Sequence, residues 1–277
     1  MLAVALYRTY AENSADTRVR SRNFYGVLNV HDSGEGRDAM RVLSHGTIVH
    51  GKQFLDPTRR GLPTSYYGLS SGIGLALLDA HEHAPLRVGV VGLGAGTLAA
   101  YGRTGDVFRF YDINPAVVEL ARSEFAFLKD SAAKVEVALG DARLSLEREQ
   151  AQNFDVLALD AFSSDAIPVH LLTVEAFKTY LRHLKPDGVL AVHISNRYLD
   201  LVPVVQQAAR HLSLEVRQVE NDDDDDVGVY RSDWMLLSPS PAPFEGELLK
   251  EAAERIDAVP RVRLWTDDYS DLYRILK

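Results

Sequence analysis

Short apolar strands alternate with helix-like stretches from about residue 62 to the end of the chain, and this alternation restricts the fold more than any other feature. The runs 87–91, 107–111 and 154–159 are typical, because each is a short and nearly continuous apolar segment. Strands without a polar side belong in a parallel sheet that helices cover on both faces. We therefore expect a doubly wound α/β domain over residues 62–277.

The first 61 residues follow a different pattern, in which strand-like runs are separated by polar turns. Residues 24–31, 40–44 and 47–50 are strand-like, and residues 32–37 form a cluster of turn formers between two of them. A small antiparallel β-subdomain over residues 1–61 is expected to precede the larger domain.

Two helices of the larger domain can be placed from their apolar spacing. Residues 66–81 become rich in leucine towards their end, and residues 114–128 carry apolar side chains near helical spacing. Asn114 and Pro115 supply a cap and a first-turn proline for the second helix.

Composition limits the classes of protein to which the chain can belong. Its 277 residues include no cysteine, which excludes disulfides, thiolate nucleophiles and cysteine-ligated zinc. The net charge of −9, without a basic cluster, argues against nucleic-acid binding and suits cationic partners. The apolar opening at residues 1–6 is too short for a membrane span or a signal peptide, so we expect a soluble, cytoplasmic protein with no membrane partner. The acidic run 222–226 is typical of a solvated loop.

A glycine-rich loop follows the strand at residues 87–91. Gly92, Gly94 and Gly96 allow a tight turn and a close approach of the backbone to a ligand, although a simple strand-to-helix turn is the alternative. Asp112 ends the next strand, 20 residues after Gly92, where a carboxylate can accept both hydroxyls of a ribose. Together these residues predict a nucleoside site in a Rossmann-like domain. The short loop suits adenosylmethionine-type ligands, which have no pyrophosphate to bind.

Carboxylates also follow the third and fourth strands of this domain. Asp141 and Ala142 come after residues 134–138, where the carboxylate can bind an adenine amino group, cap the next helix, or do both. Asp160 and Asp165 come after residues 154–159, and a desolvated carboxylate there can deprotonate or hold an attacking amine. Loop capping is the alternative for this pair.

The order of these motifs resembles that of spermidine synthase and related aminopropyltransferases, over roughly residues 22–238. Residues 45–51, 63–68 and 160–165 resemble most the divergent spermidine synthase-like domains that are often fused to membrane segments. The resemblance implies a methyltransferase-type Rossmann-like fold and a transferase that moves an aminopropyl group from decarboxylated S-adenosylmethionine to a small amine. Methylthioadenosine would leave, and no metal is needed.

The resemblance also implies roles for single residues. Asp112 would bind ribose, Asp141 adenine and Asp160 the attacking amine, while Tyr67 would line the substrate site. His50 or Gln53 would replace an acid and a glutamine that the family carries near residues 44–49. Apart from the resemblance, Asp268 near the end of the sequence is expected either to close over the acceptor or to belong to a surface turn.

One departure keeps other functions open. Ala95 stands where the family has an aspartate that holds the donor's ammonium group. Intact S-adenosylmethionine is then a plausible ligand, and a methyltransferase or a non-catalytic nucleoside-binding homologue are the alternatives. His45, His50 and His193 lack metal-binding spacing and are expected to be pocket or sheet-edge residues. The β-rich first region could pair two copies in a homodimer.

Overall fold

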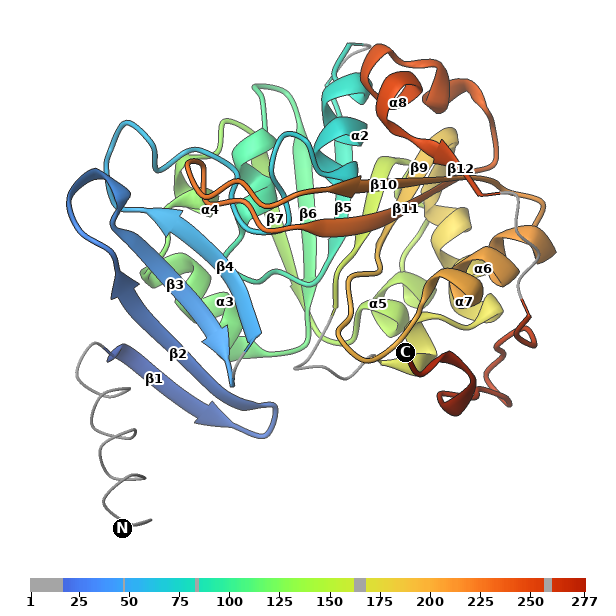
Figure 1. Cartoon of the computed structure of the whole chain (residues 1–277), viewed down its shortest axis with the longest axis horizontal. Helices are drawn as coiled ribbons and strands as arrows, with labels where there is room; N and C mark the ends of the chain where they lie inside the picture. The colour runs from blue at the N-terminus through green and yellow to red at the C-terminus, as the bar shows by residue number, and fades with distance from the viewer. Residues whose placement is uncertain (1–16, 47, 83–84, 162–167, 257–260) are drawn as a thin grey trace.

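The computed structural model describes residues 17–46, 48–82, 85–161, 168–256 and 261–277 (Figure 1). The strands are β1 (Thr17–Asn23), β2 (Gly26–Ser33), β3 (Met40–His45), β4 (Ile48–Phe54), β5 (Arg87–Val91), β6 (Val107–Asp112), β7 (Lys134–Leu139), β8 (Phe154–Leu159), β9 (Leu184–His193), β10 (Glu215–Asn221), β11 (Ser232–Ser238) and β12 (Glu254–Arg255). The α-helices are α2 (Gly72–Ala80), α3 (Pro115–Ser123), α4 (Phe127–Asp130), α5 (Ala142–Arg148), α6 (Val174–His183), α7 (Val202–His211) and α8 (Glu247–Ala252). Short 3-10 helices are η1 (Gly36–Asp38), η2 (Thr97–Tyr101), η3 (Val169–Leu171), η4 (Ala242–Glu245) and η5 (Tyr273–Ile275).

Two sheets make up the molecule. The first four strands form an antiparallel sheet in the order β1-β2-β3-β4, and the remaining strands form a sheet in the order β12-β10-β11-β9-β8-β5-β6-β7. Strands β5 to β9 pair in parallel, whereas β11 runs antiparallel to β9. The expected doubly wound α/β fold with a small antiparallel N-terminal sheet is confirmed. The boundary at residue 61 stays a prediction.

The central sheet is buried on both faces because side chains of its strands alternate between two cores. Val88 and Val90 of β5 belong to the core that includes α2 and α8, and Val91 belongs to the core that includes α5, α6 and α7. In β8, Ala158 belongs to the first of these cores and Leu157 to the second. This two-residue period in fully apolar strands explains why the sequence predicted a covered parallel sheet.

The long hairpin of β10 and β11 reaches across to the N-terminal sheet (Figure 1). Ser65 exchanges backbone hydrogen bonds with Gly228 and Tyr230 in the hairpin loop, and the Lys52 ammonium lies 3.6 Å from the centre of the Tyr230 ring. The acidic run 222–226 is part of this loop and is exposed at every position, as expected for a solvated loop.

Both predicted helices are shorter than the sequence suggested. The segment 66–81 becomes helical only at Gly72, where the Ser71 hydroxyl accepts a hydrogen bond from the Gly74 N–H. The segment 114–128 divides into α3 and α4. The cap by Asn114 is present, but the Ala126 N–H donates to the Gln53 side chain instead of continuing the helix. In the described part of the chain, no helix is long and apolar enough to cross a membrane.

Candidate active site

The carboxyl ends of five parallel strands bring the predicted site residues to one edge of the central sheet. Gly92 follows β5, Asp112 ends β6, Asp141 follows β7, Asp160 follows β8 and His193 ends β9. Backbone hydrogen bonds join the ends of neighbouring strands. For example, the Asp160 N–H after β8 donates to the Val91 carbonyl of β5 at 2.8 Å. Ligands of open α/β sheets bind at this edge, so it is the place to look for a site.

The glycine loop passes very close to other backbone segments. Gly92 has φ +97°, and a Cβ added there would lie 2.1 Å from the Asp160 carbonyl oxygen. Gly94 has φ +52°, and its added Cβ would lie 2.4 Å from the His50 carbonyl oxygen. Glycine is therefore required at both positions for backbone conformation and for space. Gly96 has φ +84° and lies against Leu128.

Asp112 holds the glycine loop and the start of α3 through two hydrogen bonds from the backbone. One carboxylate oxygen accepts the Leu93 N–H at 3.0 Å, and the other accepts the Asn114 N–H at 2.8 Å. Burial raises the pKa of Asp112, although both backbone hydrogen bonds act in the opposite direction. Each oxygen keeps a further lone pair for a ribose hydroxyl.

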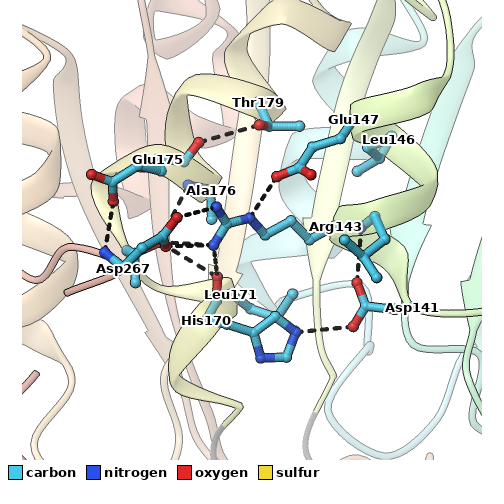
Figure 2. Close-up of polar contacts among 12 residues, drawn as sticks. Asp141, Arg143, Leu146, Glu147, His170, Leu171, Glu175, Ala176, Thr179 and Asp267 are labelled. Atoms are coloured by element: carbon cyan, nitrogen blue, oxygen red, sulfur yellow. Dashed lines mark hydrogen bonds and ion pairs between the residues drawn. The ribbon is translucent and has the colours of Figure 1, made fainter. Parts of the chain in front are cut away.

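Asp141 is held from two sides. Its Oδ1 accepts the Leu144 N–H at 2.8 Å and caps α5, and its Oδ2 lies 2.9 Å from His170 Nε2. Figure 2 shows this pair next to Arg143, whose guanidinium contacts Asp267 with both terminal nitrogens. The C-terminal segment is thus fastened beside the Asp141 loop.

A cavity of about 370 Å³ lies along the glycine loop, and we call it the glycine-loop cavity. Its lining is mainly apolar with a few polar groups, which is typical of a small-molecule site. Residues that line it include Tyr25, Leu28, His50, Gly92, Gly94, Asp112, Asn114, Asp141, Ala142, Asp160 and His170.

Gly96 and Ala95 do not line this cavity. The Ala95 side chain is 1% exposed and packs against β4, where a Cβ added to Gly51 would lie 2.6 Å from its methyl group. Position 95 therefore presents its side chain to the N-terminal sheet and offers no group to a ligand.

Asp160 is held by two side chains. Its side chain is only 12% exposed, and it accepts hydrogen bonds from the Tyr67 hydroxyl and from His193 Nδ1, the latter at 2.8 Å. Burial alone raises the pKa of Asp160, but the charge and hydrogen bond of His193 and the hydrogen bond of Tyr67 outweigh burial and leave the pKa below its ordinary value. Asp160 is therefore a carboxylate at neutral pH.

A second cavity, of about 770 Å³, lies on the other side of Asp160, and we call it the polar cavity. Charged side chains line it: Asp160, Arg197, Glu220, Arg231, Asp233 and Lys277. Tyr66, Tyr67, His193 and Ser195 line it too. Asp160 and His50 belong to the linings of both cavities, so they mark the junction between them.

His50 presents an unsatisfied polar atom at this junction. Its Nε2 is buried and has no hydrogen-bond partner among the described residues. Burial lowers the pKa of His50, so the imidazole is neutral at physiological pH. Because His50 lines both cavities, this unpaired nitrogen belongs to the wall that they share.

Two predicted substrate residues lie elsewhere. Gln53 lines neither cavity, because its amide bonds the backbone of Arg60 and Ala126 and joins two segments of the fold. Asp268 is exposed and outside both linings, while its neighbour Asp267 makes the contact with Arg143. Asp165 lies outside the described residues.

The sequence did not indicate the far wall of the polar cavity. Ser195, Asp233 and Lys277 meet there only because β11 pairs with β9 and the chain end returns to the same place. Burial raises the pKa of Asp233 to about 6. Within the described part of the chain, no group of three or more acidic or histidine side chains is arranged to hold a metal ion.

Comparison with known sequences relates the chain to polyamine aminopropyltransferases. It is 29% identical over 116 residues to the polyamine aminopropyltransferase of Vibrio vulnificus, a match that covers 39% of this chain and 38% of the relative. It is 24% identical over 181 residues to a probable polyamine aminopropyl transferase of Bifidobacterium longum, covering 62% of this chain and 35% of the relative. The chain thus spans little more than a third of the length of these relatives. No family model matches it.

Solved spermidine synthases share the fold. A probable spermidine synthase from Corynebacterium glutamicum is 18% identical, with a TM-score of 0.61 over 89% of this chain and 98% of that one. Spermidine synthase from Thermotoga maritima is 16% identical, with a TM-score of 0.58 over 83% of this chain and 75% of that one. A spermidine synthase in complex with the transition state analogue AdoDATO is 16% identical, with a TM-score of 0.56 over 83% and 74%.

Together, these sequence and fold similarities support the expected relation to the spermidine synthase-like family. The narrower resemblance to domains fused to membrane segments finds no support among them.

Proposed function

We propose that this protein is an aminopropyltransferase-like enzyme that binds an adenosyl sulfonium donor in the glycine-loop cavity and an amine acceptor in the polar cavity. The observation that carries the proposal is the junction of the two cavities at Asp160 and His50. A transferase must hold two substrates with their reacting atoms in contact, and two cavities that share a buried carboxylate meet that need.

The glycine-loop cavity fits the nucleoside part of such a donor. Asp112 would accept ribose hydroxyls, and Asp141 and the apolar wall would contact an adenine ring, since all of them line this cavity. When bound, decarboxylated S-adenosylmethionine supplies an activated carbon next to a sulfonium leaving group. That a spermidine synthase of the same fold binds the transition state analogue AdoDATO is consistent with this assignment.

The polar cavity fits a cationic acceptor. Asp160 is a largely buried carboxylate at the junction, and Asp233 lies on the same lining, whereas Glu220 is already paired with Arg231 at 3.2 Å. A polyamine-like acceptor would place its reacting nitrogen at the junction and a distal ammonium near Asp233. Asp160 would orient the reacting amine by hydrogen bonding.

Product analysis tests the proposal. The enzyme is incubated with decarboxylated S-adenosylmethionine and a panel of diamines and polyamines, and nucleoside products are separated by chromatography. Methylthioadenosine equimolar with an aminopropylated amine is expected. No methylthioadenosine with any amine contradicts the proposal.

A second candidate function is transfer from intact S-adenosylmethionine, most simply of a methyl group. The packing of Ala95 against the N-terminal sheet favours it, because this position supplies no carboxylate for the ammonium of a decarboxylated donor. The same chromatogram separates the two candidates, because methyl transfer releases adenosylhomocysteine instead of methylthioadenosine.

A further inference from the structure

Asp160, His193 and Ser195 form a continuous hydrogen-bonded chain that ends in the polar cavity. Asp160 Oδ1 lies 2.8 Å from His193 Nδ1, and His193 Nε2 lies 2.9 Å from Ser195 Oγ. Ser195 Oγ also accepts the backbone N–H of Asp233 at 2.8 Å. The arrangement has the connectivity of an Asp-His-Ser triad, in which a carboxylate orients an imidazole that acts as a base.

The carboxylate fixes which ring nitrogen carries the proton. Asp160 is ionised and can only accept hydrogen bonds, so a neutral His193 must keep its proton on Nδ1. Nε2 is then an acceptor, and the Ser195 hydroxyl donates to it. The basic atom of the chain is therefore His193 Nε2.

Asp160 is poorly suited to act as the final proton acceptor. Each of its oxygens already accepts one hydrogen bond, from Tyr67 or from His193, and these bonds favour its charged form. A carboxylate stabilised in this way is a weak base.

Two aromatic rings pack against the ring of His193. It stacks on Trp234, with ring centres 4.7 Å apart, and lies 5.2 Å from the Tyr66 ring. The titratable groups around it are Asp160, Tyr66 and Asp233, and burial raises the pKa of Tyr66 to about 12, so that it stays neutral. A fixed, 3% exposed imidazole next to a cavity meets the geometric demand for a proton acceptor.

We propose that His193, reached through the Ser195 hydroxyl, accepts the proton that the acceptor amine must lose, and that Asp160 holds His193 in the required tautomer. This inference rests on the proposed function of the two cavities. It moves the acid–base role from the carboxylate to the histidine.

The proton balance of the transfer requires such an acceptor. An acceptor ammonium gives one proton to Ser195 Oγ as the hydroxyl proton passes to His193 Nε2, which leaves a neutral amine and an imidazolium. The amine nitrogen then forms the new C–N bond while the C–S bond breaks and its electron pair stays on sulfur. The secondary ammonium product keeps its charge, so one proton per turnover returns to solvent from His193.

Steady-state kinetics of His193→Gln and Ser195→Ala test the role in catalysis. We expect kcat for methylthioadenosine release to fall about 100-fold or more in His193→Gln and about 10-fold in Ser195→Ala, with KM for the amine changed less than about threefold. His211→Gln, an exposed histidine at the end of α7, is the matched control and should keep wild-type kcat. Wild-type kcat in His193→Gln overturns the proposal.

Chemical rescue separates a chemical role from a structural one. His193→Gly leaves a space between Tyr66 and Trp234 that free imidazole can enter. Added imidazole should restore turnover at least 10-fold in this variant and leave Ser195→Ala unchanged. Lost activity that imidazole does not restore overturns the proposal.

Nitrogen-15 NMR of the imidazole rings gives a readout that does not depend on turnover. His193 should carry its proton on Nδ1 with a bare Nε2, and Asp160→Asn should abolish this preference. A proton on Nε2 of neutral His193 overturns the relay. If the wild type released no methylthioadenosine while the NMR result held, the proposed function would fail and the hydrogen-bonded chain would stand.

Discussion

The two cavities on either side of Asp160 are built in different ways. The glycine-loop cavity takes most of its lining from the loops after β5, β6, β7 and β8, which are four neighbouring strands, and the N-terminal sheet adds Tyr25, Leu28, His45 and His50. The polar cavity takes its groups from β4, the segment before α2, the ends of β9 to β11 and the chain terminus. The fold itself therefore creates the first cavity, whereas the second depends on contacts between distant segments. On the proposed assignment, we expect substitutions in the polar cavity to change acceptor preference with little effect on nucleoside binding.

Asp160→Asn should show the largest effect, because Asp160 is shared by both cavities. We expect kcat for group transfer to fall by about 10³-fold, since the variant loses the charge that orients His193 and the amine. Methylthioadenosine affinity should change only a few-fold by calorimetry. Asp187→Asn, an exposed aspartate at the opposite end of β9, is the matched control. A catalytically intact Asp160→Asn enzyme would contradict the shared role.

Gly94→Ala should damage the glycine-loop cavity selectively. The left-handed backbone at φ +52° and the His50 carbonyl 2.4 Å from the added Cβ both oppose a side chain. We expect a loss of stability of about 2–4 kcal/mol by denaturant unfolding and methylthioadenosine binding at least about 10-fold weaker by calorimetry. Gly61→Ala, where no atom lies within 4 Å, should be neutral. Unchanged methylthioadenosine binding in Gly94→Ala would show that the glycine loop does not contact the ligand.

Asp112→Asn should weaken nucleoside binding by a smaller amount. Hydrogen bonds to a charged acceptor contribute about 1.5–3 kcal/mol, so a loss of roughly 10- to 100-fold in methylthioadenosine affinity is expected. Calorimetry with methylthioadenosine and with free adenine distinguishes ribose recognition from base recognition, because only the first should weaken. Glu119→Gln, an exposed acid on α3, is the control.

Asp233 should give the polar cavity a pH dependence that the glycine-loop cavity lacks. Burial raises the pKa of Asp233 to about 6, so the side chain is mostly neutral at pH 5 and mostly a carboxylate at pH 7. A carboxylate attracts an ammonium group, so KM for the amine should fall a few-fold as pH rises from 5 to 7. Asp233→Asn should remove this change. If KM for the amine still depends on pH in Asp233→Asn, the pH dependence belongs to another titratable group.

Asp233 should affect stability with the opposite trend. Because the pKa is raised on folding, the stabilising contribution is present below the ordinary value of 3.8 and is lost as pH rises through about 6. Asp233→Asn should therefore be more stable relative to wild type at pH 7 than at pH 4, by denaturant unfolding at both pH values.

The comparison between the cavities also explains what the sequence could predict. Gly92, Asp112, Asp141 and Asp160 each follow an apolar strand, and parallel strands bring their carboxyl ends to one edge, so local sequence was enough to group them. The fold class followed from the same alternation of strands and helices.

The rest depended on pairings that local patterns do not encode. Ser195 and Asp233 meet because β11 inserts antiparallel beside β9. The helix predicted over residues 114–128 breaks because Gln53, distant in sequence, accepts the Ala126 N–H. The inward packing of Ala95 likewise depends on Gly51 of the other sheet.

The affinity of a bisubstrate compound tests most directly whether the two cavities form one reaction site. In this compound, a thioadenosine is joined through a three-carbon chain to an amine. We predict that it binds at least about 100-fold more tightly than methylthioadenosine by calorimetry, because the second contact becomes intramolecular. The gain should disappear in Asp160→Asn. Equal affinity for the two compounds would contradict a shared site at Asp160.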